Sequence, residues 1–452
     1  RCVQPCRRHS RQPRQRERHY SRQDLGLEVL AKVLAGVPQV ATWTIEGRKK
    51  GPHYVYYTVT AYRMLRDHGR DPKEKKAALA LLEQALGRTR THYRFLSQRP
   101  QNPVAAERQT GSGLLAGKVR GGGKPYLVPH FELLVGDQLR VGYEDDPWHR
   151  RLRISRGVPK RGRLDLKASG RRAPKGAPVF LVDRREKALD EMLAALEEQL
   201  KPAPKASPGK GPYLQGPKRR KPPAASMDLH VHRQAPGRRG SAPLGLWLSE
   251  TALKQHPTGA WWWLPPVIWP ESERHWRELL LRALKTRPAG LVLGAPWQLG
   301  LVPNGARAPI WAGPFCNAAN ALALETLREM GFKGAFASPE LGQADYVQLA
   351  AESPLPLGIV LKGLWPLGIA RDLPTALDPG KPFFSPREEA AWAVTHEDSH
   401  WLFPTWELDL SAHQALLRKA GYRTFVHLHE PVPQGVRLKK RQGLWNWRHG
   451  LS

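Results

Sequence analysis

The sequence predicts an α/β protein with three globular parts: a partial α/β barrel, a small antiparallel β-barrel and a second barrel-like α/β domain. At both ends of the chain, apolar runs of strand length alternate with amphipathic helical segments, which is typical of layered α/β folds. Between these ends, short β-rich runs are separated by Gly and Pro, which indicates a small barrel. A length of 452 residues is enough for two or three such domains.

Residues 1–100 are expected to form the last units of the first barrel. Residues 1–23 are nearly all polar and should be a loop. From Asp24, the run "DLGLEVLAKVLAGV" has apolar residues at helical spacing with Asp24 as N-cap, and "QVATWTIEG" predicts a strand closed by Gly47. "HYVYYTVTAYRMLRDHG" and "PKEKKAALALLEQALG" predict two further helices, each ended by Gly.

The middle of the chain should hold the small antiparallel β-barrel over residues 107–183 and an amphipathic helix over 184–200. Residues 201–242 are rich in Pro, Lys and Arg, so we expect a disordered linker. Its basic run is Lys218, Arg219, Arg220 and Lys221. These side chains could contact phosphates, because Lys and Arg gain affinity there by counterion release, or the segment is only a solvated tether.

Residues 245–452 should form the second barrel-like α/β domain. Strand-like runs such as "AGLVLGAPWQLGLV" and "LPLGIVLKG" alternate with helices such as "AANALALETLREMG". The tryptophans of "AWWWLPPVIWP" are expected in the core, with base stacking as the alternative. Cys316 is expected to be an inert buried thiol in a strand-to-helix turn.

The composition indicates which partners and which cellular compartment to expect. The chain has 72 Lys and Arg against 40 Asp and Glu, a formal net charge of +32, which favours RNA or another polyanion as partner unless it reflects a generally basic proteome. Three cysteines make no disulfide framework, so we expect a reducing cytoplasm. No apolar run approaches the roughly 18–20 residues that cross a membrane, so no membrane partner is expected.

The segment "THEDSHW" contains His-Glu-x-x-His at residues 396–400, the pattern of zinc peptidases. That chemistry needs both histidines one turn apart on a continuous helix. The flanking runs look like strands, and Pro404 would end a helix soon after. We therefore expect a hairpin turn here rather than a zinc site.

Three motifs occur in an order that resembles peptidase family U32: "RCVQPCRR", "SRQDLGLEVL" and "WTIEGRKKGPHYVYYTVTAYRMLRD". The family typically shows Arg-Gly-x-Cys-x-x-x-Cys-Arg, Ser-x-x-Asp-Leu and Lys-Ile-Glu-Gly-Arg stretches, the last followed by a Tyr-Arg pair. Residues 45–48 match the third stretch, Thr44 replaces its Lys, and Tyr62 and Arg63 match the pair. "PFCNAANALALETLREMGFKGAFASPELG", with Asn317 and Asn320, and "GLWNWRHGLS" resemble later parts of long U32 members.

The resemblance implies a TIM-like barrel followed by a small β-barrel, and thus a partial TIM-like barrel at 1–100 and a second one at 245–452. U32 members take part in oxygen-independent hydroxylation of tRNA, of rRNA or of ubiquinone precursors, and the RNA-modifying members are linked to prephenate. Some bind a [4Fe–4S] cluster through four cysteines. Others were named collagenase-like proteases.

By the same comparison, Cys2 and Cys6 match cluster-binding cysteines of the family. The other two ligands would lie upstream, so the chain is expected to be a C-terminal fragment whose first barrel is incomplete and whose ligand set is not whole. Where some relatives have a cysteine after Asp-Leu, this chain has Gly26.

The predicted site residues lie at the end of the expected strand at 39–47, because the carboxyl ends of strands carry the active site in such barrels. The family match makes Glu46 and Arg48 the candidate catalytic residues. Lys49, Lys50, His53 and Tyr54 are the candidate substrate-binding residues, which could hold a carboxylate or phosphate. A structural Glu–Arg pair with a solvated basic turn is the alternative.

Three functions follow as hypotheses. The favoured one is an iron–sulfur-dependent, oxygen-independent hydroxylation enzyme that modifies tRNA or rRNA, with prephenate as co-substrate. The second is a U32 peptidase, for which the residues supply no recognisable nucleophile, base or metal set. The third is a non-enzymatic basic scaffold that binds RNA.

Overall fold

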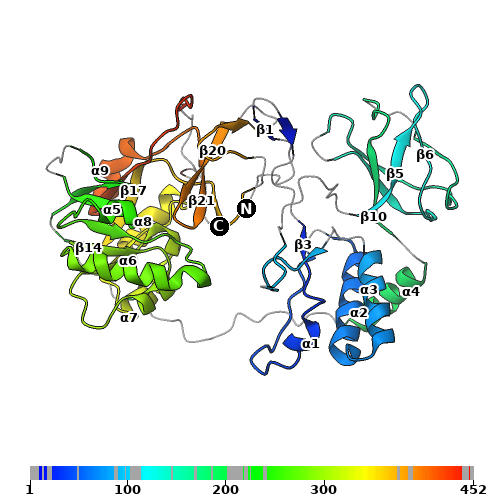
Figure 1. Ribbon diagram of the computed structural model, residues 1–452, viewed down its shortest axis with the longest axis horizontal. Helices are drawn as coiled ribbons and strands as arrows, with labels where there is room; N and C mark the ends of the chain where they lie inside the picture. The colour runs from blue at the N-terminus through cyan, green and yellow to red at the C-terminus, as the bar shows by residue number, and fades with distance from the viewer. Residues whose placement is uncertain are drawn as a thin grey trace. The chain divides into compact units, whose positions relative to one another are not determined.

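The chain divides into two compact units, residues 1–207 and 208–452, and each is described by itself (Figure 1). The computed structural model describes residues 10–12, 15–17, 23–47, 50–85, 90–96, 98–101, 113–143, 146–166, 171–184, 187–200, 217, 222–223, 225–237, 242–373, 377–384, 390–439 and 447.

Two helices of the first unit confirm their prediction: α2 (Pro52–His68) and α3 (Pro72–Gln84). Each begins with a proline, whose missing N–H would have no partner in the first turn. The Asp71 side chain caps α3 by accepting a hydrogen bond from the Lys73 backbone N–H at 2.8 Å. The two helices share a small apolar core made of Ala61, Leu65, Ala78 and Leu82 with Ala31.

The segment before α2 differs from its prediction. Instead of a long helix capped by Asp24, it forms β3 (Asp24–Leu25) and the short α1 (Ala31–Leu34). β3 pairs in parallel with β4 (Arg90–Thr91). Tertiary contacts override the helical pattern, because Tyr62 Oη accepts a hydrogen bond from Leu27 N at 3.0 Å and Glu28 pairs with Arg90 at 2.9 Å.

Two further local predictions of the first unit are corrected. The expected strand over "QVATWTIEG" is not formed, since residues 40–47 contain no strand and Glu46 is exposed. β-branched residues favour a strand only when a neighbouring strand takes up their hydrogen bonds. The expected loop at 1–23 includes a small antiparallel pair, β1 (Ser10–Gln12) and β2 (Gln15–Glu17).

The predicted small barrel is a six-stranded antiparallel half-barrel. Its strands pair in the order β8-β7-β10-β5-β6-β9. Their bounds are β5 (Leu114–Arg120), β6 (Tyr126–Leu127), β7 (Gln138–Val141), β8 (Arg150–Arg153), β9 (Leu164–Asp165) and β10 (Pro178–Asp183). Alternate residues of these strands, such as Leu139, Val141 and Val179, fill one apolar core. Helix α4 (Lys187–Gln199) follows, inside the range expected for an amphipathic helix.

The second unit is a closed barrel of eight parallel strands, in agreement with the predicted TIM-like domain. Each strand pairs in parallel with its neighbour, and β17 and β11 both pair with β23 to close the ring. The eight strands are β11 (Met227–His232), β12 (Leu244–Trp247), β13 (Trp261–Trp263), β14 (Gly290–Leu293), β15 (Ile310–Ala312), β16 (Gly334–Phe336), β17 (Leu357–Gly363) and β23 (Thr424–His429).

The first barrel strand lies where a disordered linker was expected. β11 falls inside residues 201–242 and before the predicted start of the domain at 245. The Pro, Lys and Arg content averaged over about forty residues does not reveal the six-residue strand "MDLHVH" within them. Leu229 and Val231 of this strand are fully buried. The linker prediction is therefore wrong for residues 227–232.

Large aromatic rings fill the barrel interior opposite glycines. Trp263 on β13 contacts Phe336 on β16, with ring centroids 5.1 Å apart, across the barrel. A Cβ on Gly290 would collide with the Trp261 ring, and one on Gly334 with the Trp311 ring. Glycine on one strand therefore makes room for an aromatic ring on its neighbour. Trp261, Trp262 and Trp263 are all buried, as the core interpretation predicted.

Helices surround the barrel strands in Figure 1: α5 (Glu250–Leu253), α6 (Glu273–Lys285), α7 (Ala321–Glu329), α8 (Gln343–Glu352) and α9 (Gln414–Ala420). Asn320 caps α7 by accepting a hydrogen bond from Ala323 N at 2.9 Å. Asn317 adopts a left-handed conformation just before it, so both asparagines of the family-like segment have local structural roles. Among the described residues, no helix combines the length and apolarity that crossing a membrane requires.

Between β17 and β23 the chain adds a small antiparallel sheet: β18 (Gly368–Ala370), β19 (Phe383–Phe384), β20 (Ala390–His396) and β21 (Ser399–Pro404). A short β22 (Leu408–Asp409) then pairs antiparallel with β17. β20 and β21 form a hairpin with His396 opposite Ser399, which confirms the predicted hairpin turn. The His-Glu-x-x-His segment is thus not helical, and His400 faces Thr395 across the hairpin.

The outer face of β11 and β23 carries a stack of four imidazoles, since Leu229, Val231, Val426 and Leu428 point inward between them. The stack comprises His230, His232, His427 and His429, with three ring pairs 4.3–5.1 Å apart. His230 Nδ1 lies 2.8 Å from His429 Nε2. Burial and the neighbouring histidines lower the pKa of His429 to about 4 and lower the pKa values of His230 and His232.

The packing of the barrel interior predicts that Gly334→Ala destabilises the second unit. The new methyl group meets the Trp311 ring at less than any ordinary contact distance. Overpacking of this kind costs about 1–3 kcal/mol. Urea unfolding followed by tryptophan fluorescence measures the loss. Gly300→Ala, where a Cβ meets open space, is the control, and equal stability of the two variants would contradict the packing scheme.

The imidazole stack predicts that stability falls with acid. The folded-state pKa values of His230, His232 and His429 are depressed, so the unfolded chain takes up protons first. Their contribution to stability is lost as pH falls from about 6.5 towards the folded pKa of His429, about 4. His429→Gln should flatten the pH dependence of the unfolding free energy in that window. His256→Asn, at an exposed histidine outside the stack, should leave it as in the wild type. An unchanged slope in His429→Gln would show that the stack does not control it.

Candidate functional site at the carboxyl end of the barrel

Two charged side chains meet where β11 and β23 end. His232 of β11 is in register with His429 of β23, so the residues that follow, Arg233 and Glu430, leave the two strands side by side. Each lies two positions beyond an inward-facing residue, Val231 or Leu428, so both point into the mouth of the barrel. The carboxyl end of parallel strands is where α/β barrels hold their sites.

Arg233 and Glu430 form a buried ion pair. Arg233 Nε lies 2.7 Å from Glu430 Oε2, and the two side chains are 11% and 3% exposed. Burial raises the pKa of Glu430, while the Arg233 guanidinium acts in the opposite direction. Because charges are costly to bury, an ion pair at this depth requires that the remaining polar atoms also find partners.

The rest of the Arg233 guanidinium lies among aromatic rings. Its Cζ lies 4.4 Å from the ring centroid of Trp401 on β21 and 5.0 Å from that of Trp247 on β12. Nη1 and Nη2 are both buried, and neither has a hydrogen-bond acceptor among the described residues. Only one edge of this charged, planar group is therefore paired.

His396, at the end of β20, adds a titratable group to the same cluster. Its ring lies 6.0 Å from the ring of Trp401 and 6.4 Å from that of Trp247. Burial, and then the charge of Arg233, lower the pKa of His396 well below its usual value, so the imidazole is neutral near pH 7. Its Nε2 is buried without a partner in the described part of the chain.

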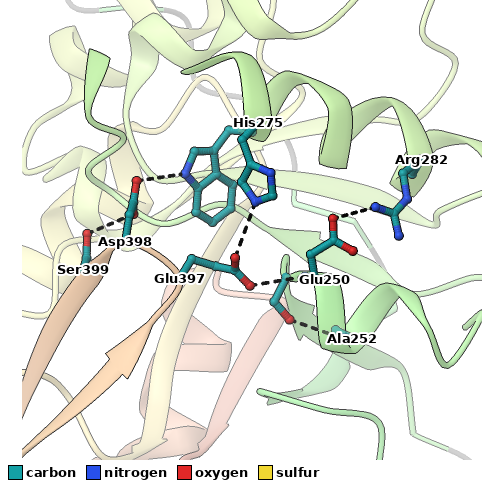
Figure 2. Close-up of polar contacts among 9 residues, drawn as sticks. Glu250, Ala252, His275, Arg282, Glu397, Asp398 and Ser399 are labelled. Atoms are coloured by element: carbon teal, nitrogen blue, oxygen red, sulfur yellow. Dashed lines mark hydrogen bonds and ion pairs between the residues drawn. The ribbon is translucent and has the colours of Figure 1, made fainter. Parts of the chain in front are cut away.

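The β20–β21 hairpin is held to the barrel by its turn (Figure 2). Glu397 accepts a hydrogen bond from Glu250 N at 3.2 Å and lies 3.5 Å from His275 Nε2. Trp276 Nε1 donates to Asp398 Oδ2 at 3.4 Å, and Trp269 Nε1 donates to Ser399 Oγ at 3.2 Å. Polar contacts to α5, α6 and the segment before α6 thus fasten the hairpin that contributes Trp401 and His396 to the cluster.

The structure describes four of the six residues predicted to form a site in the first unit: Glu46, Lys50, His53 and Tyr54. Glu46 is exposed, and Arg48 and Lys49 lie outside the described residues. The Lys50 ammonium lies 4.9 Å from the Tyr54 ring centroid. His53 is buried in the first turn of α2 and stacks on Tyr57 at 4.2 Å. Because residues 40–47 contain no strand, Glu46 does not stand at a strand end.

The predicted metal ligands Cys2 and Cys6 and the basic run 218–221 also lie outside the described residues. Cys316 is described, and it does not fit a cluster ligand. Burial raises the pKa of its thiol to about 12, and its Sγ donates to the Leu293 carbonyl at 3.4 Å. In the described ranges no group of three or more His, Cys, Asp or Glu is placed to hold a metal ion.

Sequence reasoning missed Arg233 and Glu430, although the chain carries a signal for them. "LHVHR" and "VHLHE" share an alternating pattern of apolar residue and histidine that ends in a charge. Alternation of this kind predicts strands with one face inward, and a charged residue at the end of such a strand is a candidate site residue. The first pattern lies inside residues 201–242, which were predicted to be a disordered linker, so no strand was predicted there.

Comparisons with known proteins agree with the motifs at the start of the chain. Residues 1–105 match the sequence model of the family described as peptidase family U32. No curated protein matches the chain significantly. A solved structure described as that of the U32 peptidase Mk0906 is similar at 8% identity and a TM-score of 0.31, covering 48% of this chain and 98% of that one. At residues 1–105 this chain is therefore similar to peptidase family U32.

Proposed function

We propose that this chain takes part in the oxygen-independent hydroxylation of a base in tRNA or rRNA, in the cytoplasm. The match of residues 1–105 to family U32 and a formal net charge of +32 support this proposal. A [4Fe–4S] cluster would supply the redox chemistry, with Cys2 and Cys6 as two of its ligands and prephenate as co-substrate. The chain has three cysteines and Cys316 does not suit a cluster, so the full ligand set includes donors beyond these two.

The observation that carries the RNA proposal is the charge of the half-barrel surface. Its exposed cationic side chains are Lys118, Arg120, Lys124, Arg151, Arg153, Arg156, Lys160, Arg161, Arg163, Arg171, Arg172 and Lys175. Among its described residues, the exposed carboxylates are those of Glu132 and Asp165. A surface of one sign with this density attracts a phosphate backbone by releasing its counterions.

An aromatic ring lies within this basic surface. Tyr126 on β6 is in register with Arg120 on β5, and the guanidinium Cζ of Arg163 lies 4.2 Å from the Tyr126 ring centroid. Tyrosine and arginine side by side offer both a stacking surface for a base and a charge for the neighbouring phosphate. These features support single-stranded RNA, such as a loop, as the segment bound.

The family name makes proteolysis the second function to test. The His-Glu-x-x-His segment does not favour it, because a hairpin places His396 and His400 on different strands rather than one turn apart on a helix. Cleavage of casein or gelatin by the purified protein would support a peptidase and count against RNA modification. RNA binding without any modification would support a non-enzymatic scaffold.

The hydroxylation proposal predicts that 5-hydroxypyrimidines present in wild-type RNA disappear when the gene is deleted, as measured by nucleoside mass spectrometry. Cys2→Ala and Cys6→Ala should lower iron content and abolish the modification. Cys316→Ser is the matched control and should keep both, because that thiol is partly buried and its pKa is raised to about 12. Retention of the modified nucleosides in the deletion strain would exclude this function.

The basic surface predicts the salt dependence of RNA binding. Replacing Lys118, Arg120, Arg151 and Arg153 by Ala should reduce the slope of log K against log salt by up to about 3, since each contact with single-stranded RNA contributes roughly 0.7. Arg274→Ala with Arg277→Ala removes two exposed cations of the second unit and should change the slope little.

The same titration tests the basic run. If replacing Lys218, Arg219, Arg220 and Lys221 by Ala flattens the slope and the half-barrel variant does not, the basic run holds the RNA instead. Should neither change it, RNA binding lies elsewhere in the chain.

A further inference from the structure

Arg233 and Arg371 of the second unit each pair with a carboxylate and lie against a tryptophan ring, but they differ in the burial of the carboxylate. Arg371 pairs with Glu271 at 2.7 Å and lies 4.8 Å from the Trp269 ring centroid. Arg233 likewise pairs with a carboxylate at 2.7 Å and stacks on tryptophan. Glu271 is 65% exposed, however, whereas Glu430 is 3% exposed and both terminal nitrogens of Arg233 are buried without an acceptor.

Buried donors of a charged group are costly to leave unpaired. Three such polar groups gather here, because His396 Nε2 and Trp401 Nε1 are also buried without partners among the described residues. We propose that the mouth of this barrel is a binding site for a small carboxylate, held by Nη1 and Nη2 of Arg233 beneath the β20–β21 hairpin. This inference is independent of the proposed RNA chemistry.

The shape of the unpaired group selects the ligand class. Nη1 and Nη2 present a planar fork that matches the two oxygens of a carboxylate. The rings beside the fork belong to a larger aromatic cluster: Phe315 stacks on Trp365 at 4.4 Å and lies 5.8 Å from Trp401. Aromatic surroundings suit a carboxylate on a flat, apolar body better than a strongly hydrated phosphate.

Charge balance adds a requirement. Arg233 and an ionised Glu430 already neutralise each other, so a bound carboxylate would leave one uncompensated negative charge in a buried site. Glu430 can remove that charge by taking up a proton, which its burial already favours. The protonated acid still accepts a hydrogen bond from Arg233 Nε. Carboxylate binding should therefore take up a proton and weaken as pH rises.

The hairpin provides the route of entry. It covers the cluster with Trp401 and His396, yet its turn is held by polar contacts of partly exposed groups: the His275 and Glu397 side chains are 43% and 20% exposed. These polar contacts contribute little net stability each, but Trp401 and Phe403 of the hairpin are buried in the core of the unit. Entry of a ligand therefore requires the Trp401 ring to move away from Arg233.

Benzoate, acetate and inorganic phosphate are the probes, titrated into the purified protein. Trp247 and Trp401 lie beside the fork, so binding should change tryptophan fluorescence saturably, with benzoate tightest and phosphate weakest. Arg233→Lys keeps the charge but loses the fork, and it should raise the benzoate Kd at least tenfold. Arg371→Lys is the matched control and should leave that Kd unchanged.

Glu430→Gln separates binding from a structural role, because glutamine mimics the protonated acid. It should bind benzoate more tightly than the wild type at pH 8, and its affinity should no longer depend on pH. Circular dichroism and urea unfolding establish that each variant is folded. No saturable binding of any probe, equal losses in Arg233→Lys and Arg371→Lys, or weaker binding in Glu430→Gln would each overturn the proposal.

Discussion

Pairing of β11 with β23 is the interaction on which the second unit depends. β11 is the first strand of the barrel and β23 the last, and their parallel register runs from Met227 opposite Thr424 to His232 opposite His429. This pairing removes both sheet edges, and a closed ring has no unpaired backbone to satisfy. It also brings Arg233 beside Glu430, across almost two hundred residues of chain.

Inside the closed barrel, large aromatic side chains on some strands pack against glycines on the neighbouring strands. Trp263, Trp311 and Phe336 are too large to stand opposite one another in adjacent strands, and Gly334 and Gly358 leave the space that two of these rings occupy. Because these rings pack closely against the backbone, the side chains of the barrel interior have little room to move. The rigid barrel therefore presents its carboxyl end as a fixed rim, on which the β20–β21 hairpin rests through its turn residues Glu397 and Asp398.

The two faces of β11 and β23 place titratable groups in opposite environments. Outward, four imidazoles stack at the surface, and burial, followed by the neighbouring histidines, lowers the pKa values of His230, His232 and His429. Inward, one guanidinium and one carboxyl group share a buried site with a neutral imidazole from the hairpin. The first unit has a different surface, a half-barrel rich in exposed Lys and Arg, on which the RNA proposal rests. The two proposed sites therefore differ in kind: one is an exposed cationic surface and the other is a single buried guanidinium.

The sequence by itself determined the α/β class, the α2 and α3 helices, the antiparallel half-barrel, the hairpin at His-Glu-x-x-His and the burial of Trp261, Trp262 and Trp263. Each of these rests on a local period, a cap or a turn residue, which a short window contains. Tertiary structure decided the rest. Tyr62 and the Glu28–Arg90 pair turned an expected helix into β3, and a six-residue strand inside a basic, Pro-rich stretch became part of the barrel because β12 and β23 pair with it. The Arg233–Glu430 pair could not be predicted from the sequence either, because the two residues meet only when the first and last strands pair and close the barrel.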